Sequence, residues 1–318
     1  MYKIKVKPAD FNVREVMKLD FCKGKYNYFL LRKKNWNTLN AIERIAGYLN
    51  INFKKFGYAG NKDKKAITEQ FVSVFGVSKD KLENLKIKDI SIEFLGTGVS
   101  PISLGSLEGN NFDILVRDVK KECKKVDFFA NYFDEQRFGK DNIKIGKLVV
   151  QRKFEEACKI LKLEIKNNDY IGALRSLRIR RLQFYLHSYQ SYLWNLAVSG
   201  YLKKFDNFKV KYKFGEFVFL HKKINDLEIP LINFNTKFDN KEIKDIYTNL
   251  LKEEGIKKED FLIKQIPEIV TFGVSRNLFV DVKWYYNEFL DNSQKISFYL
   301  PKGSYATILI KKIFSKCR

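Results

Sequence analysis

The sequence is poor in the residues that usually hold metal ions. Its 318 residues include only two histidines and four cysteines, and none of them follows C-x-x-C or H-x-x-x-H spacing. They are His187, His221, Cys22, Cys123, Cys158 and Cys317. A zinc site needs about four closely grouped ligands, and no such group can be drawn from these positions. We therefore expect no metal site, and we interpret these side chains as buried thiols and incidental histidines.

Long apolar runs and cofactor fingerprints are also missing. No segment approaches the ~18 consecutive apolar residues of a membrane-spanning helix. No signal peptide is visible, because the N-terminus goes straight into a strand-like alternation. Neither a G-x-x-x-x-G-K-[ST] motif nor a strand-associated G-x-G-x-x-G motif occurs. These absences lead us to expect a cytoplasmic protein with no membrane partner, no nucleotide and no other small-molecule cofactor.

Acidic residues are outnumbered. The sequence has 60 lysines and arginines against 37 aspartates and glutamates, a formal net charge of +23. Such an excess attracts phosphate backbones and releases their counterions, so nucleic acid is the leading class of partner. Aromatic residues make up 15% of the chain. Most must form the core, and a few are available as stacking platforms for flipped bases.

The most informative segment runs from Gly57 to Gln70 and reads G-Y-A-G-N-K-D-K-K-A-I-T-E-Q. One carboxylate, Asp63, lies among three lysines, directly after a stretch with little side-chain bulk. Small residues let a backbone approach a ligand closely, and basic neighbours favour the ionised carboxylate. An ionised acid in a cationic loop suits a nucleophile or base that acts on a polyanion. The alternative is a structural turn between two strands, in which Asp63 pairs with a lysine.

This segment resembles the active-site motif of the TruD family of pseudouridine synthases, roughly G-Y-A-G-x-K-D-K-x-A-x-T-x-Q. Five further blocks resemble family motifs in the family's order. They are residues 5–15 (K-V-K-P-A-D-F-N-V-R-E), 104–114 (L-G-S-L-E-G-N-N-F-D-I), 131–139 (N-Y-F-D-E-Q-R-F-G), 188–195 (S-Y-Q-S-Y-L-W-N) and 300–307 (L-P-K-G-S-Y-A-T). The resemblance therefore covers nearly the whole chain, and it is to an archaeal-type member.

The resemblance implies roles for six residues. Asp63 matches the catalytic residue that attacks the target uridine. Phe133 matches an aromatic that stacks on the target base, and Asn131 matches a residue whose amide contacts that base. The residues that line the uridine pocket correspond to Phe11 and Tyr305. Lys5 matches a basic residue near the catalytic aspartate, where it would keep the carboxylate ionised and oriented.

The residues alone leave simpler interpretations open. Phe133 is also consistent with core packing, Asn131 with a turn or cap, and Lys5 with a solvated strand lysine. Arg117 and Arg137 suit phosphate contacts and the bracing of a loop through carboxylates equally well.

The periodicity predicts an α+β fold. Helical spacing is found at residues 37–49, 154–161, 184–197 and 240–251, and strand-like patterns at 68–77, 90–96, 112–117 and 212–219. The resemblance implies a catalytic domain with a mixed or antiparallel sheet flanked by helices, interrupted by a family-specific α+β insertion domain. It places the catalytic domain at residues 1–155 and 273–318 and the insertion at 156–272. Strands at 296–299 and 305–311 would then complete the catalytic sheet.

The predicted function is a monomeric tRNA pseudouridine synthase that uses Asp63, with uridine 13 of the D-arm as the target implied by the family. This reaction needs a carboxylate, a hold on the detached base and a dry pocket, but no metal or redox cofactor. A non-catalytic RNA-binding protein is the first alternative, because charge and aromatics would support it equally. The second is a metal-dependent nuclease that pairs Asp63 with an acid such as Glu69, although the flanking lysines disfavour Mg²⁺.

Overall fold

The computed structural model describes residues 2–315 and divides the chain into two compact units. Among the described residues, the first unit comprises 2–127, 281–306 and 313–315, and the second comprises 128–280 and 307–312. Both units combine helices with strands, which confirms the predicted α+β class. Residues 128–155 pack with the second unit, whereas the resemblance groups them with the catalytic domain. The domain boundaries at 155/156 and 272/273 stay predictions, since they follow the family rather than the packing.

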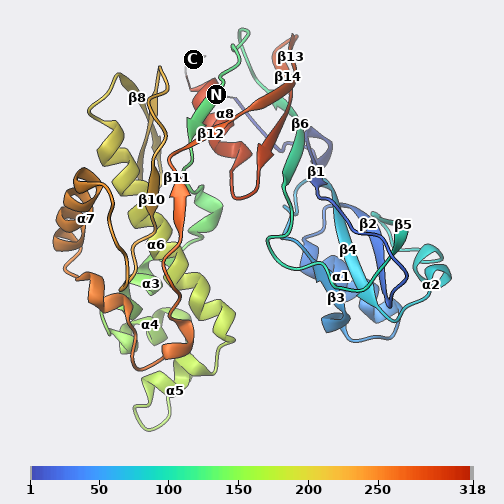
Figure 1. Cartoon of the computed structure of the whole chain (residues 1–318), viewed down its shortest axis with the longest axis horizontal. Coiled ribbons are helices and arrows are strands. Elements are labelled where there is room, and N and C mark those ends of the chain that lie inside the picture. The colour runs from blue at the N-terminus through green and yellow to red at the C-terminus, as the bar shows by residue number, and fades with distance from the viewer. Residues whose placement is uncertain (1, 316–318) are drawn as a thin grey trace. The chain divides into compact units, whose positions relative to one another are not determined.

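The first unit is built on a mixed eight-stranded sheet (Figure 1). The strand order is β13–β14–β6–β1–β4–β2–β5, and β3 pairs with part of β4. Its strands are β1 (Phe11–Val16), β2 (Tyr26–Lys34), β3 (Phe56–Tyr58), β4 (Ile67–Phe75), β5 (Ile90–Gly98), β6 (Gly109–Arg117), β13 (Lys283–Leu290) and β14 (Ser293–Pro301). The β1–β4 pair is parallel, and the other pairs are antiparallel.

Helix α1 (Thr38–Tyr48) covers one face of this sheet. It begins after Asn37, whose side chain accepts a hydrogen bond from the backbone N–H of Asn40 at 2.8 Å, as expected of a helix N-cap. Its apolar side buries Ile42 and Ile45 against strand residues such as Val72 of β4. Side chains alternate between the faces of a strand. Thr68, Gln70 and Val72 therefore face α1, whereas Glu69 lies on the opposite face.

The second unit is predominantly helical. Its helices are α3 (Asn142–Val150), α4 (Phe154–Leu161), α5 (Tyr170–Arg175), α6 (Ile179–Leu202) and α7 (Lys241–Glu253). Its strands are β7 (Phe128–Ala130), β8 (Asn207–Tyr212), β9 (Gly215–Leu220), β10 (Glu228–Pro230), β11 (Ser275–Asn277) and β12 (Phe279–Asp281), of which the last residue of β12 is counted with the first unit. Helix α6 packs against α3, α7 and β9 and buries Trp194 completely.

Most of the predicted elements are confirmed, including the four helices and the strands at 68–77, 90–96, 112–117 and 296–299. One prediction is wrong, and another holds only in part. The strand predicted at 305–311 is helix α8 (Ala306–Phe314). Ile308, Leu309 and Ile310 are all buried, and an unbroken apolar run does not distinguish a buried strand from a buried helix. The single strand predicted at 212–219 is the turn and second arm of the β8–β9 hairpin.

Short helices complete the described part of the chain: α2 (Lys79–Glu83) lies between β4 and β5, and five 3₁₀ turns occur elsewhere. None of the helices between residues 2 and 315 is long and apolar enough to cross a membrane.

Candidate active site

The loop that carries Asp63 connects β3 to β4 and is anchored to the start of α1. The Thr38 hydroxyl accepts a hydrogen bond from the backbone N–H of Lys62 at 2.9 Å and donates to the Gln70 side-chain oxygen at 2.8 Å. The amide nitrogen of Gln70 in turn donates to the Gly60 carbonyl at 3.2 Å. Thr38 and Gln70 are both nearly inaccessible to solvent. These contacts explain why Gln70 stands seven residues beyond Asp63: it fixes the loop from the neighbouring strand.

A buried ion pair holds the same loop from β1. The ammonium of Lys62 donates to the Glu15 carboxylate, and the Glu15 side chain is fully buried. Burial raises the pKa of Glu15, while the Lys62 ammonium acts in the opposite direction. Truncating either partner would leave an uncompensated buried charge, which is strongly destabilising. Lys62 therefore positions the loop from inside the fold, next to an Asp63 side chain that is 33% exposed.

Lys5 approaches Asp63 from the N-terminal segment. Its Nζ donates to Asp63 Oδ2 and lies 4.2 Å from the centroid of the Phe11 ring. The Lys5 backbone has φ +54°, a left-handed conformation that is unfavourable for a lysine. Lys5 thus contacts both Phe11 and Asp63, so the fold brings these three predicted site residues together. The pairing with lysine also matches the simpler interpretation of the loop, so it does not by itself separate a catalytic Asp63 from a structural one.

Arg117 holds this N-terminal segment in place. Its guanidinium binds both carboxylate oxygens of Asp10, at 2.9 and 2.7 Å. Its backbone exchanges two hydrogen bonds with Lys3, at 2.9 and 2.8 Å. The hydrogen bond from Arg117 keeps the pKa of Asp10 below its ordinary value. Of the two roles that the sequence left open for Arg117, bracing through a carboxylate is the one that the structure supports.

Lys33 is a residue near Asp63 that the sequence reasoning missed. Its side chain on β2 is 1% exposed, and its Nζ donates to the Trp36 carbonyl at 2.7 Å and to the Asp63 carbonyl at 3.4 Å. Burial lowers the pKa of Lys33 to about 8; the charge of Asp63 opposes this shift, and that of Lys62 adds to it. Lys33 therefore contacts the backbone of Asp63, while Lys5 binds its carboxylate. A lysine on the buried side of an alternating strand was the signal that could have identified it.

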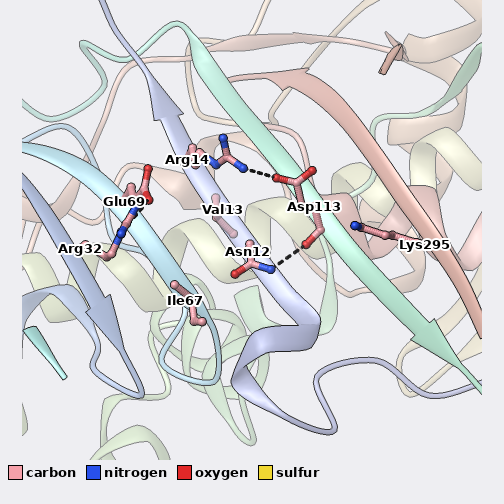
Figure 2. Close-up of a pocket in the computed structure, with 8 residues that line it drawn as sticks. All are labelled: Asn12, Val13, Arg14, Arg32, Ile67, Glu69, Asp113 and Lys295. Atoms are coloured by element: carbon pink, nitrogen blue, oxygen red, sulfur yellow. Dashed lines mark hydrogen bonds and ion pairs between the residues drawn. The ribbon is translucent and has the colours of Figure 1, made fainter. Parts of the chain in front are cut away.

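Figure 2 shows the face of the sheet opposite to the one that α1 covers. A hollow of about 670 Å³ lies there over β2, β4, β1, β6 and β14. Acidic and basic side chains alternate across it. Arg32 donates to Glu69 at 2.7 Å, and Arg14 donates to Asp113 at 2.8 Å. Glu69 is thus committed to Arg32 on the face that points away from the Thr38–Gln70 anchor of the Asp63 loop. This placement argues against Glu69 as the partner of Asp63 in the nuclease alternative.

The remaining predicted site residue of the first unit is Tyr305, which immediately precedes α8 and is partly buried. Asn131 and Phe133 belong to the second unit. They follow β7, and the backbone N–H of Asn131 donates to the Leu278 carbonyl at 2.8 Å. The side chain of Asn131 donates to the Asn277 carbonyl at 3.1 Å and accepts from Arg276 at 2.5 Å. Both polar ends of this amide therefore already have a partner within the unit.

Phe133 is held on several sides. Its backbone N–H and carbonyl both bond to the Asn195 side chain, at 3.0 and 2.8 Å. Its ring meets Trp194 edge-on, with centroids 5.6 Å apart. The guanidinium carbon of Arg276 lies 4.3 Å from its centroid, and the residue is 8% exposed. A base that stacks on Phe133 must share the ring with Arg276 or displace it.

Arg276 is the second residue that the sequence reasoning missed. Besides its contact with Phe133, its guanidinium donates to the Asn131 carbonyl at 2.8 Å. One side chain on β11 therefore fixes both of the residues that the resemblance assigns to base contacts. A signal was present: Arg276 is the single arginine between positions 182 and 317, in a chain that otherwise uses lysine there. A planar, forked cation is needed where backbone, amide and ring are contacted together.

Two further residues of the 131–139 block have structural partners in this unit. The Asp134 carboxylate accepts from Lys311 of α8, and Arg137 Nε lies 3.4 Å from the Ser191 hydroxyl. Between residues 2 and 315, no three His, Cys, Asp or Glu side chains are grouped closely enough to hold a metal ion.

Comparison with known proteins gives a consistent picture. The family model described as tRNA pseudouridine synthase D (TruD) matches residues 2–165 and 219–313. A tRNA pseudouridine synthase D from Aquifex aeolicus is 30% identical over 387 aligned positions, which cover 98% of each chain. A "probable tRNA pseudouridine synthase D" from Nanoarchaeum equitans is 32% identical and covers 92% of this chain and 87% of its own.

A solved structure also matches. The crystal structure of a TruD protein from Methanosarcina mazei superimposes with a TM-score of 0.69 at 23% identity, over 98% of this chain and 93% of that one. At this level of identity the match establishes the fold.

Proposed function

Since this chain belongs to the TruD family of tRNA pseudouridine synthases, which isomerise uridine to pseudouridine, we propose that Asp63 is its catalytic nucleophile or base and that uridine 13 of tRNA is its target. The reaction breaks the bond between uracil nitrogen and ribose, rotates the base and rejoins it through carbon. Asp63 would act either on the sugar or on the base. In both cases it must be ionised, accessible and fixed in position.

One observation carries this proposal: the residues of the motif divide into buried anchors and one accessible acid. Lys62 and Gln70 point into the fold and hold the loop, whereas the Asp63 carboxylate is one-third exposed and oriented by Lys5. A merely structural turn does not require a buried ion pair and a side-chain relay to hold it. Preorganisation of this kind is typical of an acid that must meet a substrate in a defined geometry.

The proposed roles of the other site residues rest on family position and on the contacts within each unit. Phe11 and Tyr305 would line the uridine pocket in the first unit. The resemblance assigns Asn131 and Phe133 to contacts with the base, and Arg276 fixes both of these residues. A cytoplasmic location, a monomeric state and independence from metal and other cofactors also stay predictions.

The proposal is tested by base-resolution mapping of pseudouridine in unmodified tRNA after incubation with the pure protein in EDTA. We expect conversion at uridine 13 and at full rate in the chelator. Conversion at a different uridine would leave the reaction class intact and overturn the target. An RNA that is cleaved, in a reaction that Mg²⁺ restores, would revive the nuclease alternative.

A further inference from the structure

The second unit has a row of arginine and aromatic side chains along α6. We propose that this row binds unpaired RNA beside the target nucleotide, with phosphates at its outer end and stacked bases toward Phe133. We define the track by Arg178, Arg180, Phe184, Arg137 and Phe133. The inference rests on the proposed function, because Phe133 is the residue assigned to the target base.

The inner part of the track is continuous. The guanidinium carbon of Arg137 lies 5.1 Å from the ring centroid of Phe184 and 5.9 Å from that of Phe133. Arg137 therefore links an aromatic ring that is 37% exposed to one that is nearly buried. Arg180 precedes Phe184 by four residues on the same helix, so the two lie on one side of α6. Cation and ring alternate from Arg180 to Phe133.

The outer part of the track is an unusual concentration of arginine. The chain has 12 arginines among its 60 basic residues, and four of them lie within residues 175–181. Two of the four have contacts: Arg175 bonds to Glu268 at 3.2 Å, and Arg181 bonds to the Tyr185 hydroxyl at 2.9 Å. Among the arginines that the structure describes, the side chains of Arg178 and Arg180 alone have no partner, and both are exposed.

Neither folding nor solubility accounts for these two arginines. Cations are unfavourable at the N-terminal end of a helix, so α6 gains no stability from them. Lysine supplies solubility and is four times as common in this chain. Elsewhere the chain uses arginine where a planar fork is needed, as Arg152 shows by bonding to the carbonyls of Asp260 and Leu262. A fork of this kind binds phosphate through two hydrogen bonds and stacks on bases.

The chemistry of the track fits single-stranded RNA better than a duplex. An exposed ring between two cations offers one base a stacking surface and its flanking phosphates a charge on each side. His187 lies on this helix too, but it adds no charge at neutral pH: burial, followed by the nearby charge of Arg137, lowers its pKa to about 4. At 1.5 Å per residue, Arg180 and Asn195, which holds Phe133, lie roughly 22 Å apart along α6. This length accommodates several nucleotides.

The outer part of the track also lies outside the matched family regions. The family model covers residues 2–165 and 219–313, so Arg178, Arg180 and Phe184 fall in the segment between them.

The experiment compares two double variants with equal loss of charge. Arg178→Gln/Arg180→Gln removes the outer track, and Lys209→Gln/Lys211→Gln removes two exposed lysines of β8 in the same unit. Binding of unmodified tRNA is measured across a salt series. For the arginine variant we expect affinity to fall roughly tenfold. The slope of log K against log salt should become less steep by roughly 1.4, since each of two single-strand phosphate contacts contributes about 0.7. The lysine variant should change little.

Phe184→Leu tests the stacking part of the track separately. It should weaken binding by roughly fivefold or more while leaving the salt slope unchanged, because stacking is not electrostatic. Melting temperatures verify that each variant is folded. A wild-type slope in the arginine variant, or an equal loss in the lysine variant, would overturn the track. A wild-type protein that binds tRNA and forms no pseudouridine would overturn the proposed function instead, and the binding comparison would still decide whether the track exists.

Discussion

Lys5 donates to the carboxylate of Asp63 from a backbone in the left-handed region, at φ +54°. The cost of that conformation is met by neighbouring contacts, because Lys3 pairs with the Arg117 backbone on one side and Asp10 binds the Arg117 guanidinium on the other. An unfavourable backbone conformation that its surroundings maintain often marks a functional site. Here the conformation of Lys5 places its ammonium group against the Asp63 carboxylate.

Replacing Lys5 tests whether its contact with Asp63 matters for the reaction. Lys5→Met should slow single-turnover pseudouridine formation by roughly ten- to a hundredfold, the equivalent of one charge-assisted hydrogen bond of about 1.5–3 kcal/mol. Affinity for tRNA should change little, since many phosphate contacts carry it. Lys7→Met, at an exposed lysine two positions away, is the matched control. Equal rates for the two variants would show that Lys5 is a solvated lysine with no part in the reaction.

Lys33 should give the protein a specific pH dependence of stability. Its pKa is about 8 in the folded chain, against an ordinary value of 10.5 that applies to the unfolded chain. Between these values the unfolded chain binds more protons, so Lys33 makes the free energy of unfolding rise with pH across this window. Below pH 8 the buried charge costs roughly 3 kcal/mol.

The measurement is urea unfolding between pH 8 and 10.5 for the wild type and Lys33→Met. The variant should lack the rise that Lys33 contributes, whatever its absolute stability. Identical pH profiles for the two proteins would show that Lys33 titrates as it does in the unfolded chain.

Arg276 should act on the reaction through the residues that it holds. Arg276→Lys keeps the charge and loses the fork that binds Asn131 and lies over Phe133. We expect the single-turnover rate at saturating tRNA to fall about tenfold with little change in KM, because base positioning rather than binding is lost. Arg44→Lys, at an exposed arginine over Tyr48, controls for the substitution itself. A rise in KM alone would place Arg276 among the phosphate contacts.

Phe133 combines a proposed stacking role with a buried position. Phe133→Ala should lower the modification rate by roughly ten- to a hundredfold, because stacking contributes about 1–3 kcal/mol per base. Its packing against Trp194 means that the same variant should also lose roughly 3–5 kcal/mol of stability. Rates are therefore compared per folded molecule, with the melting temperature measured alongside. Phe133→Tyr should retain most activity. A destabilised Phe133→Ala that reacts normally would make the residue part of the core only.

The sequence predicted the local elements well wherever one face of an element is buried. The spacing of Ile42 and Ile45 predicted α1, and the alternation around Val72 predicted β4. Prediction failed at α8, where Ile308, Leu309 and Ile310 form a buried apolar run that fits a strand as well as a helix. The order of strands in the sheet pairs residues far apart in the chain, such as Ile114 with Ile296, and no local pattern contains that information.

The candidate site was predictable to the extent that motifs carried it. Asp63 and Lys5 were both named from the sequence, and the structure joins them. Lys33 and Arg276 were missed because the contacts that tie them to the site are made with residues distant in the chain, Asp63 and Asn131. Such contacts leave no spacing to recognise. The signal that could have identified these two residues was the residue type itself: a lysine on a buried strand face, and one arginine in a long stretch that otherwise has none.

The central claim, that the Asp63 carboxylate is the catalytic nucleophile or base of a pseudouridine synthase, is tested most directly by Asp63→Asn. The substitution keeps the size and hydrogen-bonding capacity of the side chain and removes its charge. Single-turnover pseudouridine formation should be abolished while tRNA affinity stays within a few-fold of the wild type, because that affinity is spread over many phosphate contacts. Substantial turnover by pure Asp63→Asn protein would contradict the assignment.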